Sequence, residues 1–271
     1  MEAKIFDKMY EEFREILISG VKMKILMSLL EGTKTSRQLM EEIGISLSSV
    51  LHTARELEDK KYIEERKEGF VLTPAGKIVG QKVLDLTNSF YVTGKHKEFW
   101  LTHDVDGIPK QFIARIGEIR NTEIVKSSPK NLLQVLALYV KHVSKAKELA
   151  GISPVYVEEF SNLVKKLLNK GAKIRLVISK NIADKVFEAY KKEADEELRK
   201  KVEEGNLKIW LIDDVKIAMT VTESFVSIGL FNLDGTYDFS QDLVSYDEEA
   251  IEWGRELFEY YKSRAKEVSI P

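Results

Sequence analysis

Apolar side chains recur at helical spacing in the N-terminal part of the chain. In residues 2–18 one face of a predicted helix carries Ile5, Met9, Phe13, Ile16 and Leu17. A second helix with an apolar face is predicted between Gly20 and Gly32, because glycine commonly ends a helix. Both helices therefore present a face that has to pack against something.

A pair of capped helices follows. Thr35 and Gln38 have the spacing of a capping box, in which the threonine accepts from the backbone and the glutamine reaches back. The helix they start is expected to stop at Gly44, and Ser46 has the position of an N-cap for the next helix. The two helices are read as a helix-turn-helix pair.

Two short strands and another helix complete this region. Residues 62–66 and 70–72 predict a hairpin around a charged turn that contains Gly69. Thr73-Pro74 is an N-cap followed by a proline at the first helical position, so a helix is expected over 75–86. The order helix, short helix, helix, hairpin, helix is that of a winged helix-turn-helix.

The pattern changes after residue 88. Residues 89–121 hold few periodic signals and are interpreted as a connector with some helix around 111–119, while 145–152 fit either a helix tail or a strand. From 122 onward strands are predicted at 123–126, 173–178, 207–212, 216–222 and 225–230, with a hairpin at Glu223-Ser224. Helices are predicted after Ser128-Pro129 and at 157–169, 182–204 and 248–262. The fold class is an α+β winged helix-turn-helix in 1–88 followed by a three-layer α/β effector domain in 122–271.

Composition narrows the function classes. Lys and Arg number 42 against 44 Asp and Glu, and the net charge of -2 excludes a globally basic protein while leaving room for a small DNA-binding patch. Cysteine is absent and the four histidines show no ligand spacing, so we expect no metal and no other cofactor. The N-terminus lacks a signal-peptide layout, and the most apolar stretch, 132–140, is half the ~20 residues that span a bilayer. We predict a cytoplasmic protein that does not enter a membrane.

The second helix of a helix-turn-helix pair enters the major groove, and its N-terminal residues meet base edges. The predicted contact with a double-stranded DNA operator therefore centres on the helix that starts at Ser46 and on the tip of the hairpin. The candidate residues are Arg37, Ser46, Ser48, Ser49, His52, Thr53, Arg55, Lys60, Lys61, Arg66 and Lys67. Small hydroxyls allow close approach to phosphates, while His52 and Arg55 reach base acceptors.

The charge of this region is nearly balanced. Residues 46–82 hold seven Lys and Arg against six Asp and Glu, a balance of +1. Attraction to phosphate is therefore modest for one monomer, and a homodimer with two recognition helices is expected. The apolar face of residues 2–18 is one candidate dimer surface, and the last helix with Trp253, Phe258 and Tyr261 is a second.

Four residues of the connector and the effector domain are candidates for binding a ligand. Within Asp213-Asp214-Val215-Lys216, a buried lysine that faced a pocket would hold a small anionic ligand or metabolite, although a simple turn between two strands is the favoured interpretation. Trp100, His103 and Asp104 either line the mouth of a pocket or brace the junction between domains. The sequence leaves both possibilities open.

Four stretches carry a resemblance to a known family. They are 99–104 (FWLTHD), 107–109 (GIP), 218–222 (AMTVT) and 250–261 (AIEWGRELFEYY). With the helix order of the first half, they resemble archaeal winged-helix, ArsR-like transcriptional regulators of the methanogenesis-regulator family. That resemblance implies DNA binding and an α/β sensory domain. The cysteine and histidine cluster of metal-sensing ArsR repressors is missing, which argues against that branch.

No catalytic motif is complete. Pro74-Ala75-Gly76-Lys77 is similar to a phosphate loop, but Val71 replaces the first glycine and Ile78 follows the lysine. The second half also resembles phospholipase D-like domains, which need a histidine two residues before a lysine, where this chain has Asp214 before Lys216. We therefore expect a one-component transcription regulator and not an enzyme. A phospholipase D-like enzyme and a protein-interaction adaptor are the alternatives.

Overall fold

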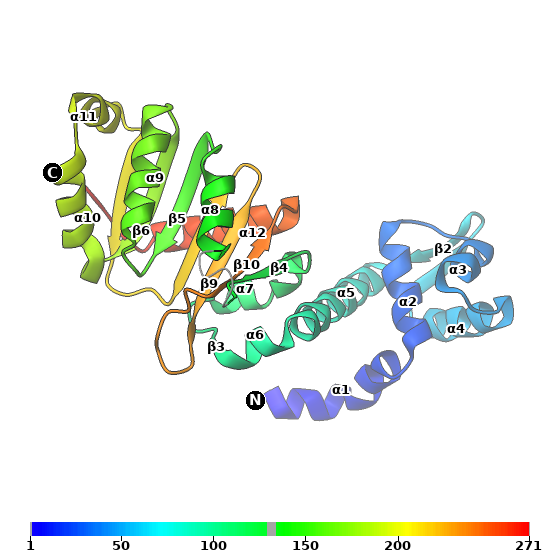
Figure 1. The fold of residues 1–271 in the computed structure, drawn as a ribbon. Helices are drawn as coiled ribbons and strands as arrows, with labels where there is room; N and C mark the ends of the chain where they lie inside the picture. The colour runs from blue at the N-terminus through cyan, green and yellow to red at the C-terminus, as the bar shows by residue number, and fades with distance from the viewer. Residues whose placement is uncertain (1, 129–133, 271) are drawn as a thin grey trace. The chain divides into compact units, whose positions relative to one another are not determined.

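The computed structural model describes residues 2–128 and 134–270 and divides into two compact units, 1–88 and 89–271 (Figure 1). The elements of the first unit are α1 (Glu2–Leu17), α2 (Gly20–Ser28), η1 (Leu29–Glu31), α3 (Ser36–Ile43), α4 (Leu47–Asp59), β1 (Ile63–Arg66), β2 (Gly69–Leu72) and the first part of α5 (Pro74–Lys95). Thr35 and Gln38 form the complete capping box of α3, and the Ser46 hydroxyl caps α4. The predicted helix starts are confirmed.

One hydrophobic cluster joins these helices to the hairpin. Its buried side chains are Ile16, Ile25, Leu26, Leu29, Leu39, Val50, Ala54, Leu57, Tyr62, Ile63, Phe70, Leu72 and Val83. Two glycines allow the backbone to pass closely. A Cβ on Gly69, whose φ is +131°, would lie 2.5 Å from the carbonyl oxygen of Lys34, and one on Gly76 would collide with the carbonyl of Tyr62. The hairpin is therefore pressed against the starts of α3 and α5.

The second unit is built on a sheet of nine strands among the described residues. They are β3 (His103–Asp104), β4 (Glu123–Lys126), β5 (Glu148–Ser153), β6 (Lys173–Ser179), β7 (Leu207–Ile212), β8 (Ile217–Thr222), β9 (Val226–Asn232), β10 (Gln241–Ser245) and β11 (Lys266–Val268). The order is β11-β7-β6-β5-β8-β9-β10-β4, and β3 pairs with β9. β5, β6 and β7 are parallel, while β8 runs antiparallel to β5, so β5 is the strand where the parallel and antiparallel halves meet.

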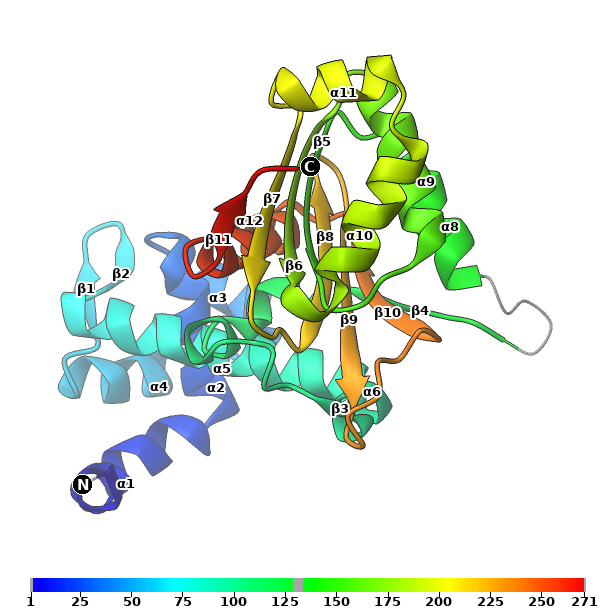
Figure 2. The same ribbon diagram turned by 90° about the vertical axis from the view of Figure 1, so that its left-hand side faces the viewer.

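Helices cover both faces of this sheet, as the turned view shows (Figure 2). The helices of the second unit are α6 (Lys97–Thr102), α7 (Lys110–Ile113), η2 (Ile116–Ile119), α8 (Gln134–Val143), α9 (Glu158–Asn169), α10 (Lys180–Glu193), α11 (Glu196–Glu203) and α12 (Glu248–Lys262). α9, α10 and α11 pack on the parallel half of the sheet, whereas α12 packs on β5, β6, β8 and β9. The two faces have separate hydrophobic clusters.

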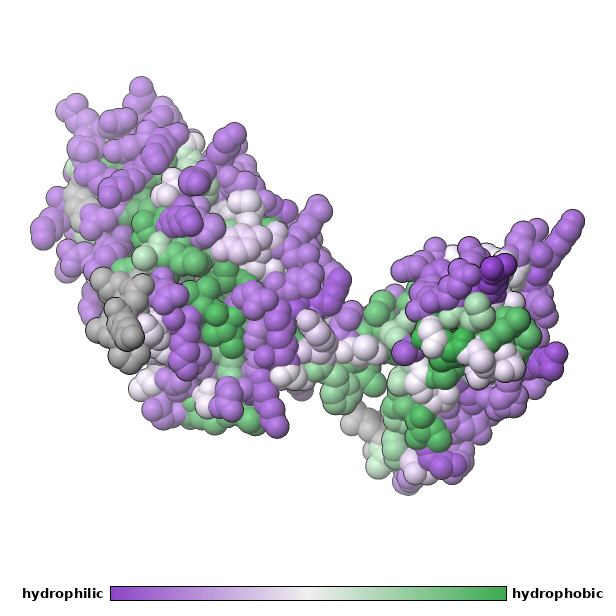
Figure 3. Space-filling view, turned by 45° about the vertical axis from the view of Figure 1, so that its right-hand side comes forward, coloured by the Kyte–Doolittle hydropathy of each residue, from purple (hydrophilic) through white to green (hydrophobic). Residues whose placement is uncertain are grey.

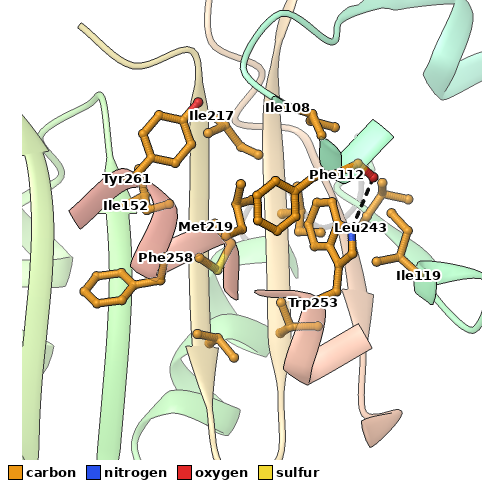
Figure 4. Close-up of a cluster of buried hydrophobic side chains, with 14 of the residues drawn as sticks. Ile108, Phe112, Ile119, Ile152, Ile217, Met219, Leu243, Trp253, Phe258 and Tyr261 are labelled. Atoms are coloured by element: carbon orange, nitrogen blue, oxygen red, sulfur yellow. Dashed lines mark hydrogen bonds between the residues drawn. The ribbon is translucent and has the colours of Figure 1, made fainter. Parts of the chain in front are cut away.

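The cluster under α12 shows how residues 89–121 are used. Phe112 lies edge-on to Trp253 with ring centroids 5.5 Å apart, and the indole nitrogen of Trp253 donates to the carbonyl oxygen of Phe112 (Figure 4). Phe99, Ile108 and Ile119 are also buried in this cluster. The segment predicted to be a connector is thus part of the second unit, because its scattered apolar residues serve tertiary packing rather than a repeating helical face.

Other differences from the predicted elements have local causes. The helix predicted over 182–204 is two helices, because Asp195 caps α11 by accepting from the backbone N–H of Leu198 at 2.9 Å. The ambiguous segment 145–152 contains strand β5, and the predicted hairpin at Glu223-Ser224 joins β8 to β9. The helix expected after Ser128-Pro129 is described from Gln134 onward as α8, and its predicted start lies outside the described residues.

Candidate DNA-contact surface and effector cavity

The start of α4 presents a group of small hydroxyls. The Ser46 hydroxyl accepts from the backbone N–H of Ser49 at 3.1 Å, and it lies 2.9 Å from the Ser48 hydroxyl and 2.8 Å from the Ser49 hydroxyl. All three serines are exposed. The positive end of the helix dipole and hydroxyls that can donate to phosphate oxygens therefore coincide at one place.

Farther along α4 the candidate residues divide by burial. His52 and Arg55 are exposed, and the His52 ring lies 3.5 Å from the carboxylate of Glu56, one turn on. Thr53 is buried at 8% exposure, so the prediction that it faces outward is wrong. It follows Val50 by three residues and precedes Leu57 by four, which places it on the same apolar face. Leu47, which the sequence did not single out, is exposed beside the serines.

Acidic neighbours neutralise several of the predicted basic contacts. Arg37 pairs with Glu41 at 3.1 Å, Lys60 with Glu15 at 2.8 Å and Arg66 with Glu64 at 3.0 Å. The hydrogen bond to Glu15 is the main cause that raises the pKa of Lys60. Within the described ranges Arg55, Lys61 and Lys67 have no ion pair. Of the seven candidates that are Arg or Lys or His, these three keep a positive charge that a nucleic acid can reach.

Helix α1 contacts the rest of its unit through its C-terminal half. Besides the Lys60–Glu15 pair, the Tyr62 hydroxyl donates to the carboxylate of Glu12, and burial raises the pKa of Tyr62 to about 12. The apolar side chains nearer the N-terminus stay exposed, namely Ile5, Phe6, Met9, Tyr10 and Phe13. Hydrophobic residues are visible on the surface of both units in the space-filling view (Figure 3).

The four predicted ligand residues of the second unit satisfy one another or the backbone. Lys216 donates to Asp104 at 3.0 Å and lies 3.6 Å from Asp106, and its side chain is 47% exposed. The backbone N–H of Asp106 and the Lys216 ammonium lower the pKa of Asp104. The interpretation of Lys216 as a buried lysine in a pocket is wrong, and the favoured turn between β7 and β8 is confirmed. This lysine is neutralised because β3 brings two carboxylates beside it.

His103 and Trp100 have structural partners. The His103 ring is buried, stacks on Phe99 with centroids 4.1 Å apart, and lies 3.1 Å from the carboxylate of Asp238. The indole N–H of Trp100 donates to the carbonyl oxygen of Val92 at 3.1 Å. Both side chains brace the segment that packs on β9, and the pocket-mouth role left open for them is not supported by these contacts.

A cavity of about 430 Å³ lies elsewhere in the second unit, between the sheet and helices α8, α9 and α10. Its walls are largely apolar and include Leu136, Phe160, Val164, Leu176, Val186 and Tyr190. None of Trp100, His103, Asp104 and Lys216 lines it. The cavity adjoins β5, the strand where the parallel half of the sheet meets the antiparallel half.

One end of this cavity is polar. The Tyr139 hydroxyl lies 2.9 Å from the Thr220 hydroxyl, and the Ser227 hydroxyl donates to a carboxylate oxygen of Asp242 at 2.8 Å. Tyr237 completes the group. A Cβ on Gly229 would collide with the Tyr237 hydroxyl and lie 2.8 Å from the second carboxylate oxygen of Asp242, so the missing side chain of Gly229 gives these groups their room.

Burial sets the protonation of the polar end. It raises the pKa of Asp242 from 3.8 to about 6, against the opposing effect of the Ser227 hydrogen bond, and the charge of Asp238 adds to the rise. Burial also raises the pKa of Tyr139 to about 12 and that of Tyr237 well above its usual value. At neutral pH the polar end therefore offers one carboxylate among neutral hydroxyls.

The sequence analysis missed this group for a definable reason. Strand β10, which carries Asp242, was not predicted, and Thr220 and Ser227 lie in the predicted strands 216–222 and 225–230 but were not singled out. A usable signal was present, because Ser227 and Gly229 interrupt an otherwise apolar strand on one face. Small or polar residues on a buried strand face indicate that something other than a core side chain is accommodated there.

The described residues were also compared with the requirements of a metal site and of a membrane-spanning helix. Within residues 2–128 and 134–270, no group of three or more His, Asp or Glu side chains is arranged to hold a metal ion. No helix in the described part of the chain is long and apolar enough to cross a membrane.

Sequence comparisons match both halves of the chain. A profile described as "Methanogenesis regulatory protein FilR1, N-terminal domain" matches residues 10–90, and one described as "Methanogenesis regulatory protein FilR1, middle domain" matches residues 132–264. The methanogenesis regulatory protein FilR1 of Methanothrix harundinacea (strain 6Ac) is 30% identical over 252 residues. That alignment covers 92% of this chain and 56% of the relative, so the chain spans about half the length of the curated relative it matches.

Two solved structures are more distant. TrmBL2, described as an archaeal chromatin protein with a novel mode of DNA binding, is 14% identical, with 97% of this chain and 99% of that chain covered at a TM-score of 0.43. Phosphatidylserine synthase of Haemophilus influenzae Rd KW20 is 13% identical, with 55% of this chain and 40% of that chain covered at a TM-score of 0.40. Neither likeness is close enough to carry an argument about this chain.

The two profiles and the relative all carry the name of the same regulatory protein, and the two profiles match in the order N-terminal domain, then middle domain. Both profiles and the relative describe regulatory proteins, in agreement with the expectation of a regulator that is not an enzyme. The chain is similar in sequence to the methanogenesis regulatory protein FilR1 and matches the profiles of its N-terminal and middle domains, in that order.

Proposed function

We propose that the protein is a one-component, DNA-binding transcription regulator. Its first unit is a winged helix-turn-helix of the ArsR-like kind, in which α3 and α4 form the helix pair and β1–β2 form the wing. The observation that carries the proposal is the distribution of unpaired positive charge. Arg55 on α4, Lys61 beside the hairpin and Lys67 at its tip have no carboxylate partner among the described residues, whereas Arg37, Lys60 and Arg66 do.

The chemistry at these positions suits the two kinds of DNA contact. Exposed Arg55 can form a bidentate pair with a guanine edge in the major groove, and Leu47 can contact a thymine methyl group. The hydroxyls of Ser46, Ser48 and Ser49 at the N-terminus of α4 suit phosphate oxygens. Lys67 at the hairpin tip suits the DNA backbone beside the groove.

The test is a titration of the full chain against the duplex upstream of its own gene and a random duplex of equal length, at two salt concentrations. Arg55→Ala should weaken binding to the cognate duplex by about 1–3 kcal/mol and change binding to the random duplex little. Lys67→Ala should weaken binding to both and lower the salt slope by about one. Arg37→Ala is the matched control, because its charge is already paired with Glu41.

If Arg37→Ala weakened binding as much as Arg55→Ala did, the assignment of the recognition surface would be wrong. If the wild-type chain bound neither duplex, with or without added cell-extract metabolites, a protein-interaction adaptor would be the better interpretation.

We further propose that the regulator acts as a homodimer. Support comes from the N-terminal half of α1, where the Phe6 ring is tilted against the Tyr10 ring and T-shaped to the Phe13 ring, and all three rings are exposed. An exposed aromatic face of this kind usually packs on a partner, and the near-neutral charge of one DNA-binding unit favours paired units. Light scattering should show a dimer at micromolar concentration, and Phe6→Glu with Phe13→Glu should give a monomer. A monomeric wild type would contradict this part of the proposal.

The second unit is proposed to hold the effector. Its cavity is apolar with a cluster of polar groups at one end, which is the usual character of a small-molecule site. Lys216 is not expected to hold a small anionic ligand, because the carboxylates of Asp104 and Asp106 already neutralise that lysine.

A further inference from the structure

The charge at the polar end of the cavity is negative, because Asp242 is the charged residue there. Asp242, Glu159 and Lys165 are the charged residues that line it among the described residues. Glu159 is exposed, and Lys165 pairs with Asp195 at 3.3 Å. Asp242 therefore faces the polar end without a nearby cation, and an anionic ligand placed there would be repelled.

Asp242 has unused hydrogen-bonding capacity. In the described part of the chain, Ser227 is the one donor to its carboxylate, through a single oxygen, and no Lys, Arg or His lies within ion-pair distance. The second oxygen lies over Gly229, next to the Tyr237 hydroxyl, which also has no partner among those residues. A half-buried carboxylate beside an apolar cavity, with one hydrogen bond and no cation, is costly to ionise, and a ligand that supplies the missing donors lowers that cost.

We propose that this cavity binds a small molecule that has an apolar body and one protonated amine, with the ammonium group against Asp242. This inference deepens the proposed effector role of the unit, on which it rests. An ammonium group has three donors and no acceptor, which matches the free carboxylate oxygen of Asp242 and the hydroxyl oxygens of Tyr237 and Thr220. The apolar body lies along the walls formed by Phe160, Leu176 and other side chains of α8–α10 and the sheet.

The volume and the walls set the size of this ligand. A cavity of about 430 Å³ falls in the range of about 300–1,000 Å³ that is usual for small-molecule sites. The rings of Tyr139 and Phe160 lie 4.7 Å apart by centroid at the wall next to the polar end. Aromatic faces close to a carboxylate favour a cation over a neutral group of the same shape.

The test uses three probes with one body: 4-phenylbutylamine, 4-phenylbutan-1-ol and 4-phenylbutanoate. Binding to the full chain is measured by calorimetry at pH 7.5 without DNA, so the result does not depend on DNA binding. The amine should bind at least tenfold more tightly than the alcohol, and the carboxylate should not bind. Equal affinity of amine and alcohol, or preference for the carboxylate, would overturn the proposal.

Two variants locate the effect. Asp242→Asn keeps the shape of the side chain and should weaken the amine at least tenfold while leaving the alcohol unchanged. Glu159→Gln is the matched control, because it removes another cavity carboxylate that is exposed at the rim, and it should leave both ligands unchanged. If Asp242→Asn bound the amine as wild type does, the proposal would fail. Circular dichroism of both variants shows whether they are folded.

The pH dependence gives a second readout. The groups that face Asp242 are Tyr139 from α8, Ser227 from β9, and Tyr237 and Asp238 from the segment before β10. Because the pKa of Asp242 is about 6 and both tyrosines stay neutral, amine affinity should fall about tenfold for each pH unit below 6. Affinity that is constant from pH 7.5 to 4.5 would contradict an ion pair with Asp242.

The outcomes separate this inference from the proposed function. If the amine binds through Asp242 and the chain binds no DNA, the ligand assignment stands and the regulator proposal fails. If DNA binding follows Arg55 and Lys67 as expected and the amine does not bind, the ligand assignment fails alone.

Discussion

In the first unit, the side chains proposed to contact DNA lie between Ser46 and Lys67 and point to solvent, on one helix and the hairpin that follows it. In the second unit, the polar end of the cavity gathers Tyr139, Thr220, Ser227 and Asp242 from α8, β8, β9 and β10. A surface that binds DNA can be formed by one continuous stretch of sequence, because it requires only side chains that are exposed and suitably charged. A cavity for a small molecule needs a sheet to bring distant residues together.

The largest effect on stability is expected in the hydrophobic cluster between α12 and the sheet. Phe258 on α12 is fully buried, with the Trp210 ring edge-on at 6.4 Å and the Arg175 guanidinium 4.9 Å from its centroid. Phe258→Ala should lower the free energy of unfolding of the second unit by about 3–5 kcal/mol, because it leaves a cavity in the core. Urea unfolding followed by tryptophan fluorescence reports on this unit, which contains Trp100, Trp210 and Trp253.

Leu233→Ala is the control for this comparison, because Leu233 lies in the same unit and is 71% exposed. It should change the free energy of unfolding by less than about 0.5 kcal/mol. If the two variants shifted the urea midpoint equally, the second unit would not depend on the cluster beneath α12.

The next effect concerns the free-energy cost of ionising the half-buried carboxylate of Asp242. The folded state raises the pKa of Asp242 from 3.8 to about 6. Protonation of Asp242 therefore contributes its full free energy to the stability of the folded state below pH 3.8, and this contribution is lost as the pH rises through 6. That difference corresponds to about 3 kcal/mol. Asp242→Asn should therefore be more stable than wild type at pH 8 by up to about this amount, and the advantage should shrink toward pH 4.

Urea unfolding of wild type and Asp242→Asn at pH 4, 6 and 8 measures this directly. The control is Asp213→Asn, which removes an exposed carboxylate that pairs with Lys180 in the turn before β8, and loss of a surface pair of this kind should cost no more than about 1 kcal/mol. If Asp242→Asn were less stable than wild type at pH 8, Asp242 would be a structural residue of the unit. A gain in stability from removing a polar group is expected where the group serves a ligand.

Sequence reasoning succeeded where a local rule decides the structure. The capping box at Thr35, the N-cap at Ser46 and the hairpin around Gly69 depend on neighbours within a few residues, and all three are present. It failed where tertiary contacts decide. Thr53 is polar in the sequence but buried in the fold, and Lys216 lost its predicted role because β3 carries Asp104 to it from more than a hundred residues away.

The candidate sites follow the same division. The DNA-contact residues could be named from the sequence, but not which of them pair with Glu15, Glu41 or Glu64, because side-chain pairing depends on how helices and strands lie in space. The cavity could not be predicted, because its polar end is created by the register that sets Ala218 opposite Gly229 and by a strand, β10, that was not recognised.

The smallest effect tests how far local capping supports the DNA surface. The Thr35 hydroxyl accepts from the backbone N–H of Gln38 at 3.2 Å, and the Gln38 side chain accepts from the backbone N–H of Thr35 at 2.8 Å. Lys34, just before this cap, exchanges two backbone hydrogen bonds with Phe70 of the hairpin. Thr35→Ala should cost about 1 kcal/mol of stability, because it leaves an N-terminal N–H of α3 without its acceptor. Thr35→Ser keeps the hydroxyl and should cost much less.

Since α4 has its own cap at Ser46, Thr35→Ala should leave the ratio of cognate to random DNA affinity unchanged at temperatures where the unit is folded. Differential scanning calorimetry and the two-duplex titration measure the two quantities. A change in that ratio with Thr35→Ala and not with Thr35→Ser would mean that the start of α3 is itself part of the recognition surface.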